Sequence, residues 1–167
     1  MDYAYYVLGA VGDRVLVVKK GDDGQCISLI LKVKDSDVKA VEFPIQRWAA
    51  LREQVDDANV AANRVMNKQP DIKLRRHIGG GYYISVTSGY YCVDIRKFYR
   101  PYGAADSEIR ATKRGVALRF SEWSHLCSLI PTLNESHPSM SSAHPCYFDH
   151  LNQMAWFECS ECNPFPV

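Results

Sequence analysis

Cations and aromatic rings alternate through residues 93–119, a stretch that begins VDIRKFYRPYG. A single-stranded nucleic acid binds where cations follow its phosphates and aromatic faces stack on its bases, with about 1–3 kcal/mol for each stacked base. Arginine suits a phosphate that takes two hydrogen bonds, because its guanidinium is a planar fork. The candidate contacts are the cations Arg96, Lys97, Arg100, Arg110, Lys113 and Arg114, with Tyr99 and the upstream Tyr83 as stacking residues.

Four lysines near the start of the chain form a second, smaller basic set. Lys19 and Lys20 end one predicted strand, and Lys32 and Lys34 end the next. Such lysines can contact phosphates as point charges, or they can simply solvate the edge of a sheet. We therefore expect them to contribute less to the binding of a polyanion than the arginines of residues 93–119.

Soft metal ligands gather at the end of the chain. His144 and Cys146 are separated by twelve intervening residues from the pair Cys159 and Cys162. One histidine and three cysteines can close a tetrahedral zinc site. Because a single Cys-x-x-Cys pair is a weak signal, free thiols or a disulfide are the alternative to zinc, and no other cofactor is expected. The zinc deaminase pattern is absent from the sequence.

Positive charge is concentrated in the middle of the chain. The formal net charge of the whole sequence is only +1. Residues 64–114, however, hold eleven basic and four acidic residues, whereas the segments on either side are net negative. A basic segment of this kind is typical of a surface that binds phosphates, although a solvated strand face would give the same composition.

The sequence argues against several classes of protein. It has no nucleophile elbow, no phosphate-binding glycine loop before a helix and no HExxH motif, so we do not expect an enzyme. No run approaches about 18 apolar residues, so no membrane span is expected. Met1 is not followed by a basic and then apolar leader, so the six cysteines are expected to be reduced, in a soluble intracellular protein.

A weak internal repeat organises the elements that carry these residues. Sliding the chain by about 75 residues aligns Trp48 with Trp123, each in the first turn of a predicted helix. The same comparison matches the hairpin at residues 5–20 with the hairpin at 82–97, and so places Lys19 opposite Arg96. Chance similarity between two β-rich segments is the alternative explanation.

The repeat predicts an α+β fold, in which two antiparallel units of a four-stranded sheet plus a helix form a pseudo-dimer within one chain. The predicted divisions are a first unit at 1–66, a basic linker at 67–81, a second unit at 82–133 and an aromatic, cysteine-containing tail at 134–167. Pro70 and the three glycines at 79–81 are typical of a flexible connection.

The second unit carries a recognisable set of motifs. Asp94-Ile95-Arg96 ends a strand, Phe98-Tyr99 follows it, and Lys113-Arg114-Gly115-Val116 precedes a helix that bears Trp123. In these features residues 82–133 resemble the C-terminal domain of the transcriptional coactivator positive cofactor four. The chain departs from that family at Tyr99, where tryptophan is usual, and at residues 87–89, where a basic-aromatic loop is usual.

The resemblance implies a function. Members of that family bind single-stranded DNA, and partly melted duplex, in basic-aromatic channels on the sheets of a symmetric dimer. It therefore implies sequence-tolerant single-stranded DNA binding in transcription or replication, in the nucleus, with transcription or replication proteins as partners and with further dimerisation of the chain as an option. The first unit would then be a degenerate half that completes the core. The alternatives are RNA binding, or an interaction scaffold whose aromatic tail recruits a protein.

Overall fold

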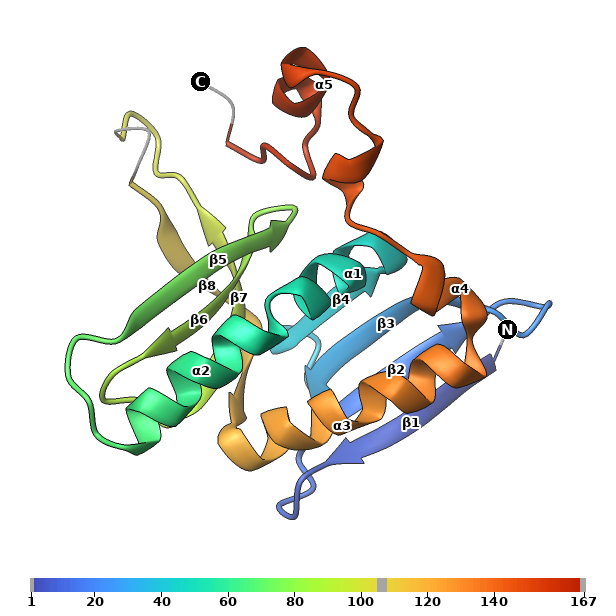
Figure 1. Ribbon diagram of the computed structural model, residues 1–167, viewed down its shortest axis with the longest axis horizontal. Helices are drawn as coiled ribbons and strands as arrows, with labels where there is room; N and C mark the ends of the chain where they lie inside the picture. The colour runs from blue at the N-terminus through green and yellow to red at the C-terminus, as the bar shows by residue number, and fades with distance from the viewer. Residues whose placement is uncertain (1, 105–107, 166–167) are drawn as a thin grey trace.

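The structure is a computed structural model, and it describes residues 2–104 and 108–165 (Figure 1). The first half of the chain forms a four-stranded antiparallel sheet in the order β1-β2-β3-β4, followed by two helices. These elements are β1 (Asp2–Leu8), β2 (Arg14–Lys20), β3 (Cys26–Val33), β4 (Ala40–Pro44), α1 (Ile45–Glu53) and α2 (Val55–Met66).

The second half repeats this plan and adds a tail. Its sheet has the order β5-β6-β7-β8 and is also antiparallel throughout. The elements are β5 (Lys73–Gly79), β6 (Tyr82–Thr87), β7 (Cys92–Tyr99), β8 (Arg110–Arg119), α3 (Phe120–Ser136), α4 (Pro138–Ser142), the 3-10 helix η1 (Cys146–Asp149) and α5 (Gln153–Glu158). The predicted α+β fold with two four-stranded sheet units is therefore confirmed.

The helices hold the two units together over a shared core. The chain turns at Gln54, so that α1 packs on β3 and β4 of its own sheet while α2 packs on β6 of the other sheet. In return, α3 contacts β1 of the first sheet as well as β7 and β8 of its own. One continuous hydrophobic cluster joins both sheets and these helices, with Leu16, Trp48, Ile84 and Trp123 among its members.

The two tryptophans occupy equivalent positions. Trp48 and Trp123 are each the fourth residue of their helix, and each is at most 2% exposed. Their polar atoms differ, because Trp123 Nε1 donates a hydrogen bond of 2.8 Å to Asn59 Oδ1 whereas Trp48 Nε1 has no partner among the described residues. The repeat therefore preserves the packing of these rings but not their hydrogen bonds.

The structure corrects the predicted linker and the alignment of the strands. Residues 73–79 form β5, the first strand of the second sheet, rather than a flexible connection within 67–81. The hairpin at 82–97 is consequently β6–β7, which corresponds to β2–β3 and not to β1–β2. Lys32 pairs with Ala40, and Arg96 pairs with Gly115. The two partner residues are equivalent, because Ala40 lies five residues before the start of α1 and Gly115 lies five residues before the start of α3. Lys32, not Lys19, is therefore the counterpart of Arg96.

Gly115 lies in a position of β8 that has no room for a side chain. A Cβ atom there would lie 2.6 Å from the carbonyl oxygen of Ile95 and 2.7 Å from Cα of Arg96, both on the neighbouring strand. We expect Gly115→Ala to lower the free energy of unfolding by about 1–3 kcal/mol, because backbone atoms would have to move. Urea unfolding followed by circular dichroism measures this change.

Gly21→Ala provides the control for that substitution. The methyl group added at Gly21 meets only side-chain atoms, the nearest being Cδ1 of Ile27 at 3.2 Å, and these can shift. Equal losses of stability in the two variants would contradict the steric reason given for Gly115.

Candidate nucleic-acid interface and metal centre

A groove of about 740 Å³ lies on the outer face of the first sheet, and we call it the first groove. The alternation of β1 places Tyr3 and Tyr5 on this face, where they are 49% and 68% exposed. The second unit supplies one wall, with Tyr82, Lys97 and Arg114. The basic residues that line the groove are Lys32, Lys34, Arg47, Lys97 and Arg114.

The first groove has a mixed but predominantly positive lining. Three acidic residues, Asp35, Asp37 and Glu42, accompany its five basic residues. The cations come from both units, since Lys32 and Lys34 belong to the first unit and Lys97 and Arg114 to the second. Lys97 also lies with its Nζ 5.7 Å from the centre of the Tyr82 ring. Cations beside aromatic faces in an open groove are the chemistry that single-stranded nucleic acids require.

A second groove, of about 410 Å³, lies on the outer face of the second sheet. Lys73 and Arg75 of β5 line it, together with Tyr90 and Phe98. Phe98 is only 7% exposed, and the Arg75 guanidinium carbon lies 5.3 Å from its ring centre. Lys73 and Arg75 are not among the predicted contacts, because their segment has the composition of a linker.

Arg96 is engaged within its own sheet. Its guanidinium binds the Asp94 carboxylate at 3.0 Å and donates to the backbone oxygen of Thr112 at 3.1 Å. Tyr83 is similarly occupied, because its ring packs against Phe98 and against His77 at centroid distances of 5.0 and 5.1 Å. These contacts favour structural roles for Arg96 and Tyr83.

The remaining predicted contacts are dispersed. Tyr99 is 45% exposed on β7, and the exposed Arg110 pairs with Glu108 at 3.0 Å. Lys113 is exposed on β8, and Arg100 lies over the ring of Phe165 at 5.6 Å. Lys19 and Lys20 are half-buried at the end of β2 and do not line the first groove. Of the predicted cations, the first groove brings together Lys32, Lys34, Lys97 and Arg114.

Four aromatic or basic residues that were not predicted as contacts also line the first groove. They are Tyr3, Tyr5, Arg47 and Tyr82. The alternating spacing of Tyr3 and Tyr5, just before and at the start of the predicted hairpin, is the signal that could have found two of them, since in a strand it puts both rings on one face. Arg47 gave no such signal, because it lies on a helix and reaches the groove only through the tertiary fold.

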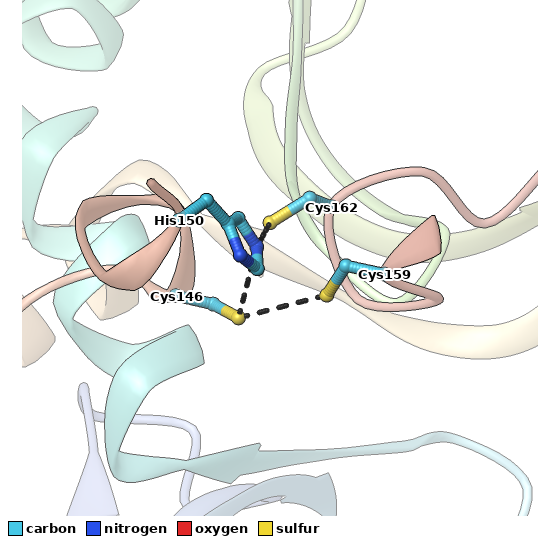
Figure 2. Close-up of side chains that lie close together, drawn as sticks. All are labelled: Cys146, His150, Cys159 and Cys162. Atoms are coloured by element: carbon cyan, nitrogen blue, oxygen red, sulfur yellow. Dashed lines mark hydrogen bonds between the residues drawn. The ribbon is translucent and has the colours of Figure 1, made fainter. Parts of the chain in front are cut away.

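A metal-ligand cluster lies in the tail, formed by Cys146, His150, Cys159 and Cys162 (Figure 2). Their ligand atoms all lie within 4.8 Å of one another. Cys146 Sγ is 3.7 Å from both His150 Nε2 and Cys159 Sγ, and His150 Nε2 is 3.2 Å from Cys162 Sγ. A tetrahedral zinc ion with its usual bond lengths keeps such atoms about 3.5–3.8 Å apart. The cluster therefore has nearly the dimensions of a zinc site.

The structure corrects one of the predicted metal ligands. His144 is not part of the cluster, because its Nε2 atom binds Asp149 Oδ1 at 2.8 Å and its ring stacks on Phe148. His150 takes the fourth position, since η1 folds the chain so that His150 returns to Cys146. Cys146, Cys159 and Cys162 are placed together as predicted, and all have free thiols.

The Cys159–Cys162 turn favours a thiolate at Cys159. Burial opposes ionisation there, but hydrogen bonds from the backbone N–H groups of Cys162 and Glu161 hold the pKa of Cys159 below its usual value. Burial, together with hydrogen bonds to the other thiols, raises the pKa of Cys162 to about 12. A metal ion would remove this conflict, because it stabilises several adjacent thiolates at once.

Among the described residues, no helix combines the length and the apolar character needed to cross a membrane. Comparisons of the chain with protein-family models, with curated proteins and with solved structures find no match.

Proposed function

We propose that this protein binds single-stranded DNA with little sequence preference, and that the first groove is the main binding site. The observation that carries the proposal is the composition of that groove, in which the exposed rings of Tyr3 and Tyr5 share one open cavity with four cations, Lys32, Lys34, Lys97 and Arg114. Tyr82 and Arg47 also line the cavity, but both are nearly buried. Stacking on tyrosine tolerates any base, and lysine and arginine contact the phosphates that all sequences share. The resemblance to positive cofactor four adds support, and it suggests a role in transcription or replication in the nucleus.

The proposed site uses both units of the chain. The first sheet supplies the floor with Tyr3 and Tyr5, and the second unit supplies the wall with Tyr82, Lys97 and Arg114. This differs from the expectation that the first unit serves only to complete the core. The second groove, with Lys73 and Arg75, is a secondary surface on which the same strand can continue.

Fluorescence anisotropy tests this function directly. A labelled oligo-dT, an RNA of the same length and a duplex are titrated with the protein at two salt concentrations. We expect oligo-dT to bind more tightly than duplex, and its affinity to fall steeply with salt as counterions are released from the phosphates. Binding that is equally weak for all three ligands would overturn the proposal, and tighter binding of RNA would redirect it to RNA.

We propose that the metal held by the cluster is Zn²⁺. Three thiolates and one imidazole are soft ligands that suit zinc, and four protein ligands leave no open position for catalysis. Such a site is structural, so zinc would stabilise the tail rather than contact a substrate. Atomic absorption on the purified protein should find one zinc per chain.

An exposed apolar surface on the tail favours a second function, the recruitment of a protein partner. Phe148, Leu151, Met154 and Phe157 are between 54% and 96% exposed. These four side chains all fall within residues 148–157, and clustered exposed apolar side chains often mark protein interfaces. This role is compatible with nucleic-acid binding in the groove. The affinity for such a protein partner would be almost independent of salt concentration.

A further inference from the structure

One arginine joins the tail, the first groove and helix α1. The Arg47 Nε and Nη2 atoms bind the two carboxylate oxygens of Glu161 at 2.8 and 2.7 Å, and Nη1 donates to the backbone oxygen of Glu42 at 2.9 Å. The Arg47 guanidinium carbon also lies 5.0 Å from the ring centre of Tyr82. The Arg47 side chain is only 14% exposed, so its position is set by these contacts.

Glu161 is also part of the turn that carries two of the candidate metal ligands. In the sequence it lies between Cys159 and Cys162. The backbone oxygen of Glu161 accepts a hydrogen bond of 2.8 Å from the N–H of Gly80. The turn that holds two metal ligands is therefore attached to the body of the protein through Glu161.

The glycines at residues 79–81 fit this attachment. A Cβ atom on Gly79 would lie 2.1 Å from Glu161 Oε1, and one on Gly80 would lie 2.4 Å from Arg47 Nη2. Both residues have positive φ angles, of 125° and 61°. The loop is thus shaped to receive the Glu161–Arg47 pair. This explains why Gly79 and Gly80 are glycines, although the composition of the segment suggests a flexible linker.

We infer that metal binding in the tail and nucleic-acid binding in the first groove are coupled through the Glu161–Arg47 pair. This inference rests on the proposed function of the groove. With metal bound, the Cys159–Cys162 turn is fixed and Glu161 holds Arg47 over Tyr82, so this part of the groove lining is ordered. Without metal, the turn loosens and Arg47 loses its partner. The nucleic acid must then order this part of the lining as it binds, which weakens its affinity.

Thermodynamic linkage makes the coupling reciprocal. If metal strengthens the binding of nucleic acid by some factor, nucleic acid must strengthen the binding of metal by the same factor. The coupling also predicts that residues which do not touch the metal affect its affinity, as groups that orient a ligand turn generally do.

Zinc affinity in full-length variants tests the first half of the inference. Glu161→Ala removes the partner of Arg47, and Glu158→Ala removes the same charge from an exposed site at the end of α5. With a chromophoric chelator as competitor, we expect Glu161→Ala to lower zinc affinity about 10–100-fold and Glu158→Ala to leave it unchanged. Arg47→Ala should reproduce the loss, with circular dichroism confirming that each variant is folded. Equal zinc affinities in Glu161→Ala and Glu158→Ala would overturn the inference.

Oligonucleotide affinity tests the second half. For the wild-type chain, we expect oligo-dT to bind about tenfold more tightly with zinc than after chelation and removal of the chelator. In Glu161→Ala this difference should disappear, whereas Glu158→Ala should keep it. Affinity that is unchanged by zinc in the wild type would overturn the coupling, and so would tighter binding without zinc, because Glu161 would then mask a phosphate-binding cation. If oligo-dT did not bind at all, the proposed function would be overturned instead. The zinc affinities of the variants would still test whether the Glu161–Arg47 pair supports the metal site.

Discussion

Replacing His150 with alanine is expected to lower the affinity for zinc by at least about 100-fold. Structural zinc in small domains binds with about 10–16 kcal/mol, which four ligands share, so the loss of one ligand removes about 2.5–4 kcal/mol, a factor of about 100 to 1,000 in affinity. The prediction follows from the position of His150 Nε2, which is 3.2 Å from Cys162 Sγ and 3.7 Å from Cys146 Sγ. Competition with a chromophoric chelator measures the affinity.

His144→Ala is the matched control for this prediction. His144 is the other histidine close to Cys146, but its Nε2 atom binds Asp149. The substitution should leave zinc affinity within about threefold of the wild type, since it touches no ligand of the cluster. If His144→Ala and His150→Ala exchanged their effects, the ligand set of the cluster would be wrong.

The double substitution of Lys97→Ala and Arg114→Ala should weaken the binding of oligo-dT about 10–100-fold at low salt. Both cations line the first groove, together with Lys32 and Lys34. Each phosphate contact to a single strand adds about 0.7 to the slope of log affinity against log salt, so the slope should fall by about 1.4. Anisotropy titrations at four salt concentrations give both quantities.

A variant with Arg110→Ala and Lys113→Ala removes the same charge from the same unit. Arg110 is paired with Glu108, and neither residue lines the first groove. This variant should lose less than about threefold in affinity, with almost the full salt slope. A larger effect than that of the Lys97 and Arg114 pair would move the binding site to the β7–β8 hairpin.

The sequence was sufficient to predict the two-unit fold, because the strongest signals were local. Trp48 and Trp123 each lie in the first turn of a helix, and in both units that helix follows the last strand of the sheet directly. The strand β5 was missed because its outward residues, Lys73 and Arg75, give it the composition of a charged linker between Pro70 and the glycines. An edge strand with charged outer residues has little apolar alternation to detect.

The alignment failed for a different reason. Shifting the sequence by one fixed number of residues cannot align all the elements of two units whose loops differ in length. The β7–β8 connection is longer than the β3–β4 connection. The shift that aligns the helices therefore misaligns the earlier strands, and Lys19 was matched to Arg96 in place of Lys32.

The sites were predicted in part. Cys146, Cys159 and Cys162 came from spacing alone, whereas the choice between His144 and His150 depends on how η1 turns the chain. The first groove was not predicted as one site, because its lining comes from both units and from helix α1. Only the tertiary fold brings Tyr5, Arg47 and Lys97 to the same cavity.

The fusion of two units into one chain has a consequence for the direction in which a ligand strand runs. In a symmetric homodimer both binding faces are identical, so a single strand meets the same groups whichever way its 5′ end points. Here Tyr3 and Tyr5 occupy the positions on β1 that Lys73 and Arg75 occupy on β5, as their pairing with β2 and β6 shows. One edge is aromatic and its counterpart is cationic. If the protein binds single-stranded DNA as we propose, the two polarities of the strand therefore meet different groups.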